Sequence, residues 1–163
     1  MQHSFEMTDL GEMVYFLGME IKQEKNELFI CQKKYAKDIL TKFRMENCKE
    51  TATPMCQKEK LSKNDEAEKV DKTLYRSLVG CLMYLTATRP DILYVVSLLS
   101  SNCATDTHLR EAKRVIRYVK GTLNFGIKFY ENKKYVLQGY SDSDWGGSSD
   151  DMKSTSGYCF NLG

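Results

Sequence analysis

The spacing of apolar residues changes along the chain from strand-like to helix-like and back. Residues 14–21 are aromatic and branched, which is typical of a strand, and a second apolar run follows at 28–31. The polar turn at 23–27 between them predicts a β-hairpin with a loop of about five residues. Apolar side chains then recur every four positions over 33–45, which predicts a helix.

A second group of helices is predicted in the middle of the chain. Residues 72–88 carry a helical apolar pattern, and Pro90 fits the first turn of the next helix. Residues 92–99 include one polar side chain, which predicts a helix buried on all sides. A third helix is expected over 108–120, ended by Gly121.

The remaining segments complete an α+β pattern. Residues 125–130, 135–140 and 156–162 are predicted strands. Residues 46–72 contain Pro54 and few large apolar side chains, which predicts a solvated linker. We therefore expect an N-terminal β-hairpin and helix, a central helical group and C-terminal strands.

Charge is unevenly distributed along the sequence. Residues 1–139 hold 23 Lys and Arg against 18 Asp and Glu, whereas residues 140–163 hold one Lys and four Asp. A basic body followed by an acidic segment is typical of a protein that contacts phosphates and holds a cation, but so small a difference also arises by chance.

Composition also argues against several classes of protein. The six cysteines form no Cys-x-x-Cys pair and there are two histidines, which argues against a zinc site. We find no Gly-x-Ser-x-Gly elbow and no phosphate-binding glycine loop. Without a secretory signal or a membrane-length apolar run, the chain is predicted to be intracellular, cytoplasmic or nuclear, and not bound to a membrane.

The predicted helix over 108–120 has a basic side. At 100° per residue, five cations fall on one side of it: Arg110, Lys113, Arg114, Arg117 and Lys120. One interpretation is a ridge that follows a phosphate backbone. The other is the ordinary solvated face of an amphipathic helix.

The acidic segment also has two interpretations. Asp142 and Asp144 alternate at strand spacing and would share one side of a strand, where Mg²⁺ could relieve their repulsion. Alternatively, they belong to a turn rich in Asp, Gly and Ser. The pair Asp150 and Asp151 is interpreted as a surface turn.

Short motifs recur in a fixed order along nearly the whole chain, and together they resemble the Pol polyprotein of Ty1/copia-type retrotransposons. These are Met7-Thr-Asp-Leu-Gly11, Tyr15-Phe-Leu-Gly18, Gln32-Lys-Lys-Tyr35, Thr53-Pro54, Tyr75-Arg-Ser-Leu-Val-Gly80, Leu82-Met-Tyr84, Thr88-Arg-Pro-Asp91, Ala112-Lys-Arg114, Arg117-Tyr118, Lys120-Gly-Thr122, Gly139-Tyr-Ser-Asp142, Asp144-Trp145 and Lys153-Ser-Thr-Ser-Gly-Tyr158.

The resemblance implies a division of the chain. Residues 1–45 would be the end of a reverse transcriptase palm and the start of the thumb, and 46–72 a linker. Residues 73–130 would be a helical thumb and connection region, and 133–163 the incomplete start of a ribonuclease H-like β-sheet.

The resemblance also implies a chemistry for the parent protein, which would be an RNA-directed DNA polymerase with ribonuclease H acting on RNA/DNA hybrids. Asp142 matches the first carboxylate that binds catalytic Mg²⁺, and Asp144 is a second candidate ligand. We expect the Tyr-x-Asp-Asp turn of the polymerase upstream of this segment and the other ribonuclease H carboxylates beyond Gly163.

We therefore expect a fragment without catalytic activity alone that does not bind Mg²⁺ stably. One alternative is a non-catalytic nucleic-acid-binding or interaction module using the basic helix. Another is a transcript remnant without a selected role.

Overall fold

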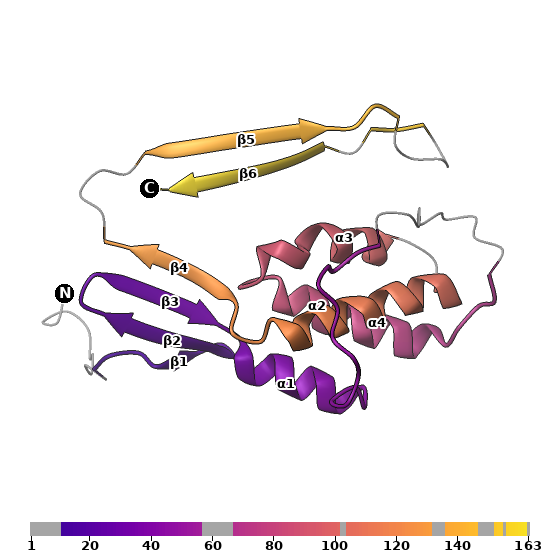
Figure 1. The fold of residues 1–163 in the computed structure, drawn as a ribbon, viewed down its shortest axis with the longest axis horizontal. Coiled ribbons are helices and arrows are strands. Elements are labelled where there is room, and N and C mark those ends of the chain that lie inside the picture. Colours follow the sequence, from indigo (N-terminus) through magenta and orange to yellow (C-terminus); the bar gives the residue numbers. More distant parts are fainter. Residues whose placement is uncertain are drawn as a thin grey trace, which may run out of the picture.

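The computed structural model describes residues 11–56, 67–101, 104–131, 136–146, 152–154 and 156–162 (Figure 1). In these ranges, four α-helices pack together beside a four-stranded antiparallel sheet, and a separate two-stranded hairpin follows near the C-terminus. The predicted α+β class is therefore confirmed. None of the helices in the same ranges is long and apolar enough to cross a membrane.

The main sheet has the order β1-β2-β3-β4, with β1 at Tyr15–Phe16, β2 at Met19–Glu24 and β3 at Glu27–Cys31. The predicted hairpin exists between β2 and β3. The single strand predicted over 14–21 was wrong, because the chain reverses at Leu17 and Gly18. Both residues have positive φ, 48° and 75°, which is the left-handed geometry of a tight hairpin turn.

The fourth strand comes from a distant part of the sequence. β4 at Gly126–Tyr130 pairs with β3 in antiparallel register, with Gly126 opposite Cys31. A Cβ atom at Gly126 would clash with the carbonyl oxygen of Ile30. Glycine thus permits the close approach of β4 to β3. The strand that precedes the helices and the strand that follows them are thereby joined in one sheet.

The helices are α1 at Lys33–Lys42, α2 at Lys72–Leu85, α3 at Leu93–Ser101 and α4 at Asp106–Gly121, and a 3₁₀ turn at Pro90–Ile92 precedes α3. Asp71 caps α2 by accepting from the Thr73 amide at 2.8 Å, and the Thr105 side chain caps α4. The prediction that 92–99 is buried on all sides was wrong. Leu93 and Tyr94 are each 54% exposed, because α3 packs against α2 and α4 on one side only.

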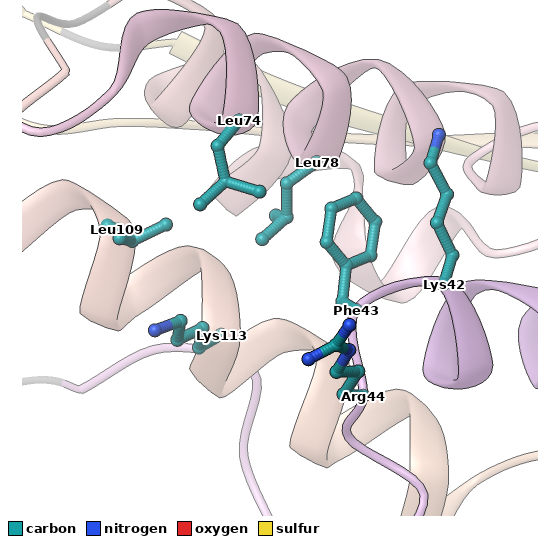
Figure 2. Close-up of a pocket in the computed structure, with 7 residues that line it drawn as sticks. All are labelled: Lys42, Phe43, Arg44, Leu74, Leu78, Leu109 and Lys113. Atoms are coloured by element: carbon teal, nitrogen blue, oxygen red, sulfur yellow. The ribbon is translucent and has the colours of Figure 1, made fainter.

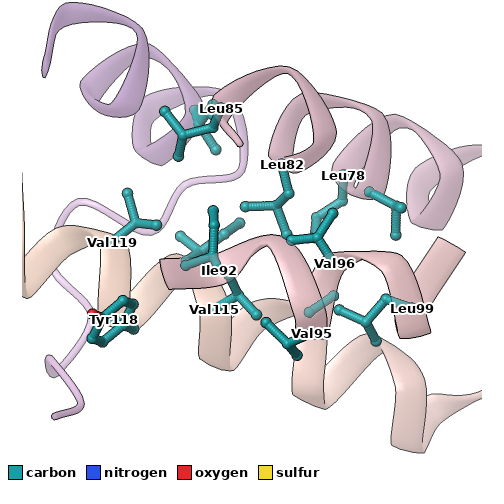
Figure 3. Packing of buried hydrophobic residues seen from close by; sticks show 14 of the residues in the cluster. Leu78, Leu82, Leu85, Ile92, Val95, Val96, Leu99, Val115, Tyr118 and Val119 are labelled. Carbon is teal, nitrogen blue, oxygen red and sulfur yellow. The ribbon is translucent and has the colours of Figure 1, made fainter. Parts of the chain in front are cut away.

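The hydrophobic core lies between the four helices (Figure 3). Leu82, Ile92 and Leu99 have no exposed surface, and Val115 and Ile116 of α4 are equally buried. Removal of such side chains from water, at about 25 cal/mol per Å² of apolar area, supplies the main force that holds the helices together.

Part of the predicted solvated linker is packed instead. Residues 48–56, which we call the covering segment, lie against α4, and the Met55 side chain packs on the core. Residues 68–70 pair with the start of α4, where the Asp106 amide donates to the Glu68 carbonyl at 2.9 Å. Residues 57–66 of the predicted linker lie outside the described residues.

Two predicted C-terminal strands form a hairpin of their own. β5 at Leu137–Ser143 pairs with β6 at Ser156–Leu162, and the described side chains of both strands are exposed. In Figure 1 the hairpin lies apart from the helices and the main sheet. A ribonuclease H-like arrangement of these strands stays a prediction, as does the division of the chain into four regions.

A buried ion pair connects the helices to the main sheet. Arg89 is 2% exposed and donates from Nε and Nη2 to the two carboxylate oxygens of Asp91, at 2.9 and 2.7 Å. Its guanidinium also donates to the backbone carbonyl and the side-chain oxygen of Thr122, at 3.1 and 2.7 Å. Tyr118 of α4 donates to Asp91 at 2.8 Å. We call these four residues the Arg89 network.

Two further contacts extend the Arg89 network to the sheet. The guanidinium lies 5.3 Å from the ring centroid of Phe125, the residue before β4. On the other side, the Thr88 hydroxyl donates at 2.9 Å to Gln32, the residue between β3 and α1, and both are buried. Motif residues from four parts of the chain therefore meet at one structural junction.

The ionisation of Asp91 couples this junction to pH. Burial acts to raise the pKa of the Asp91 carboxyl, but the hydrogen bonds from Arg89 and Tyr118 outweigh it and hold the pKa below its ordinary value of 3.8. A lowered pKa in the folded state gives stability that is present above about pH 4 and is lost as the pH falls through the folded-state pKa.

We predict that Asp91→Asn lowers the free energy of unfolding by about 2 kcal/mol at pH 7, because it leaves the buried Arg89 cation without its counterion. This loss is smaller than that for a fully buried ion pair, because the Asp91 side chain is partly exposed to solvent. Urea unfolding measures the change. The difference from the unmutated protein should shrink below about pH 4. Asp38→Asn, on the exposed side of α1, is the control and should cost less than about 0.5 kcal/mol. A loss that does not depend on pH would contradict the assignment.

Candidate nucleic-acid interface and acidic hairpin

The five predicted basic residues lie on the side of α4 that faces away from the core. We call them the cationic face: Arg110, Lys113, Arg114, Arg117 and Lys120. The opposite side of the helix is buried, including Ala112, Val115 and Ile116. The amphipathic pattern that predicted this helix is therefore confirmed, and it fixes the direction in which the cations point.

Three of these cations hold the covering segment. Arg117 Nε donates to the Lys49 carbonyl at 2.7 Å, and Lys120 Nζ donates to the Cys48 carbonyl at 2.7 Å. Arg114 Nη2 donates to the Thr53 hydroxyl at 3.0 Å. All three acceptors are neutral, so the contacts position the cations without cancelling their charge.

The other two basic residues are more exposed. Arg110 forms a 3.1 Å ion pair with Asp106, one turn earlier in α4, and both side chains are more than half exposed. Such a pair is weak in water. Lys113 is exposed and has no hydrogen bond or ion pair among the described residues. The cationic face thus keeps most of its positive charge.

The covering segment was not foreseen from the sequence. Its contacts with Arg117 and Lys120 use backbone carbonyls of Lys49 and Cys48, and every residue type carries a carbonyl. No pattern of side chains could therefore have indicated them. The motif Thr53-Pro54 was the only local signal, and Thr53 indeed accepts from Arg114.

The acidic residues occupy the end of the exposed hairpin. Asp142 lies in β5 opposite Gly157, and its side chain accepts from the Ser143 amide at 3.0 Å. β5 ends at Ser143, so Asp144 follows the strand and does not continue its alternation. Asp150 and Asp151 lie outside the described residues. Across the described ranges, no three His, Cys, Asp or Glu side chains are grouped to hold a metal.

Among the described residues, the carboxylates of the hairpin could supply part of the ligands of one Mg²⁺ ion but not those of a binuclear centre. Asp142 offers a carboxylate of the type that Mg²⁺ prefers. A two-metal site needs several carboxylates in fixed positions, whereas the described part of the hairpin brings only Asp142 and Asp144 near each other. The roles predicted for Asp142 and Asp144 stay predictions.

Comparison with known proteins places the chain in a family. A family model for reverse transcriptase (RNA-dependent DNA polymerase) matches residues 1–57. The chain is 42% identical over 161 residues to the retrovirus-related Pol polyprotein from transposon RE1 of Arabidopsis thaliana, and 36% identical over 168 residues to that from transposon TNT 1-94 of Nicotiana tabacum. These matches cover 98% and 96% of this chain, but 11% and 13% of the two polyproteins.

A shorter relative is matched over most of its length. An uncharacterized mitochondrial protein of Arabidopsis thaliana is 42% identical over 162 residues, which is 98% of this chain and 67% of that protein. No solved structure matches. The chain belongs to the Pol polyproteins of Ty1/copia-type retrotransposons, as its ordered motifs indicated, and corresponds to a small part of the full-length members.

We predict that the double substitution Arg117→Ala and Lys120→Ala releases the covering segment, because both of its charge-assisted hydrogen bonds from these residues are lost. Hydrogen–deuterium exchange of the amides in 48–53 should become about fivefold faster or more, which corresponds to about 1 kcal/mol. Lys113→Ala, on the same helix, should leave the exchange unchanged. Equal exchange in the two variants would show that the contacts do not hold the segment.

Proposed function

We propose that the chain supplies a non-catalytic nucleic-acid-binding surface to the reverse transcriptase and ribonuclease H region of a retrotransposon Pol polyprotein. The observation that carries the proposal is the cationic face of α4, in which three of the five cations, Arg114, Arg117 and Lys120, are held by neutral groups rather than by carboxylates. A phosphate backbone is the partner that satisfies a row of uncompensated cations, since each contact releases a condensed counterion.

The geometry favours a surface that is already formed before nucleic acid arrives. Arg114, Arg117 and Lys120 are each fixed at their tips by the covering segment, which reduces the side-chain entropy that binding would otherwise cost. Lys49 of the covering segment is exposed and adds a further cation beside Arg117. Contacts of this kind position a nucleic acid without reading its sequence.

The partner and the cofactor follow from the family and belong to the same proposal. The natural ligand would be an RNA/DNA hybrid within the parent polyprotein, at an intracellular site. Mg²⁺ would act only in the complete enzyme, with Asp142 as one of several carboxylates. By itself the chain would have neither polymerase nor nuclease activity, because one or two carboxylates cannot position two metal ions and an attacking water.

We predict that the chain binds an RNA/DNA hybrid in a salt-dependent manner, as measured by fluorescence anisotropy. Between about 50 and 200 mM salt, the affinity should fall roughly a few hundredfold or more, because salt competes with the contacts to phosphate. Arg114→Gln with Arg117→Gln should reduce the slope of log affinity against log salt by about two. Lys22→Gln with Lys25→Gln, which removes two charges from the exposed β2 hairpin, should change the slope less. Affinity independent of salt would refute the proposal.

We further predict that the purified chain with Mg²⁺ does not cleave the RNA strand of a hybrid, as measured by gel electrophoresis of a labelled strand. The reason is the incomplete set of carboxylates around Asp142. The same assay with Asp142→Asn separates intrinsic activity from a contaminant. Cleavage that Asp142→Asn abolishes would contradict the proposed inactivity.

A further inference from the structure

The covering segment places a threonine hydroxyl against a cation of α4. Thr53 is exposed to solvent, and its side-chain oxygen accepts a hydrogen bond from Arg114 Nη2 at 3.0 Å. Arg114 Nε is buried and has no hydrogen-bond partner among the described residues. The guanidinium of Arg114 therefore meets one neutral oxygen, although it has a further donor without an acceptor.

Arg89 shows which group binds this edge of a guanidinium when both donors are used. Its Nε and Nη2 atoms donate to the two oxygens of one carboxylate, that of Asp91, at 2.9 and 2.7 Å. A phosphate group also offers several oxygens and binds arginine in the same bidentate manner. The corresponding edge of Arg114 suits such an anion, and the Thr53 oxygen already lies at one of its two donors.

The residue that follows Thr53 distinguishes its hydroxyl from all others in the sequence. The chain has two prolines; Pro90 follows Arg89 and Pro54 follows Thr53, so Thr53 is the one hydroxyl residue that precedes a proline. Proline favours extended geometry at the preceding residue. Proline-directed protein kinases select a serine or threonine in this setting. The covering segment belongs to no helix or strand, so a kinase would not have to break a backbone ladder to bind it.

The charges around this hydroxyl favour a phosphate. Arg117 and Lys120 follow Arg114 along α4 and hold the same segment. Glu111 of α4 and Glu50 of the segment are carboxylates nearby, and no ion pair in the described ranges joins either of them to Arg114. A phosphate opposite a group of basic side chains forms new charge-assisted hydrogen bonds and orders the segment that carries it.

We propose that Thr53 is a phosphorylation site of a proline-directed protein kinase, and that its phosphate binds the Nε and Nη2 edge of Arg114. In the transfer, the Thr53 oxygen forms a bond to the γ-phosphorus of ATP, and the bond from that phosphorus to the β–γ bridging oxygen breaks. ADP leaves, and the hydroxyl proton passes to a base of the kinase. The product carries a charge of about −1.5 to −2 at pH 7.

The position of the phosphate has two consequences. A charge-assisted pair replaces a hydrogen bond to a neutral hydroxyl, so the covering segment opens less often. The positive charge of the cationic face also falls by about two, so its contacts to nucleic acid weaken. The second consequence rests on the proposed function, whereas the phosphorylation site and the first consequence do not.

The site is tested by treating the full chain with an active mitogen-activated protein kinase, ATP and Mg²⁺, and locating phosphate by mass spectrometry of peptides. Phosphate is expected on Thr53. Thr53→Val and Pro54→Ala should each abolish this modification, whereas Thr51→Val, which removes a nearby hydroxyl that no proline follows, should leave it in place. The proposal is overturned if Thr53 stays unmodified, or if Pro54→Ala is phosphorylated there at the same rate.

The pairing with Arg114 is tested by hydrogen–deuterium exchange of the amides in 48–53, before and after phosphorylation. The phosphate should slow exchange about fivefold in the unmutated chain and should have no effect in Arg114→Gln. Lys113→Gln is the matched control and should keep the slowing. Lys113 precedes Arg114 in α4, but it lines a hollow between the end of α1, α2 and α4 (Figure 2). Equal slowing in Arg114→Gln, or none in the unmutated chain, refutes the pairing.

Binding of the RNA/DNA hybrid separates this proposal from the proposed function. Phosphorylation should weaken hybrid binding about tenfold at low salt and reduce the slope of log affinity against log salt by about two. If hybrid binding is independent of salt while the kinase and exchange results hold, the proposed function falls and the phosphorylation site stands. If hybrid binding depends on salt while the kinase leaves Thr53 unmodified, the phosphorylation site falls and the proposed function stands.

Discussion

The buried guanidinium of Arg89 is the constraint on which the arrangement of the described body depends. It donates four hydrogen bonds, two to Asp91 and two to Thr122, and it lies near the rings of Tyr118 and Phe125. A cation removed from water is stable only with such partners, so the 3₁₀ turn, the end of α4 and the start of β4 must meet there. β4 in turn pairs with β3, and Gln32 connects β3 to α1.

This constraint gives four of the family motifs in this chain a structural role. Residues of four motifs meet at this junction through hydrogen bonds: Gln32, Thr88 to Asp91, Tyr118 and Thr122. These residues fix the end of α4 through Tyr118 and Thr122. The helix in turn exposes Arg110 and Lys113 and holds the covering segment with Arg114, Arg117 and Lys120. The covering segment lies on that helix.

The hairpin that carries Asp142 differs physically from this body. Its strands pair with each other, and large apolar side chains on it are exposed, including Tyr140, Tyr158 and Phe160, while Trp145 just beyond β5 is 99% exposed. Two strands without a covering layer are marginally stable in water. The cationic face therefore rests on a packed core, whereas Asp142 rests on an exposed two-stranded hairpin.

The sequence by itself determined the elements and the family. Helical spacing of apolar residues located the four helices, the cationic face followed from α4 because 3.6 residues per turn separate its two sides, and ordered motifs identified the Pol polyproteins. Tertiary structure alone decided the reversal at Leu17, the pairing of β4 with β3, the burial of Arg89 and the position of the covering segment. These depend on contacts between residues far apart in the chain, many through backbone atoms common to all residues, and local patterns carry no record of them.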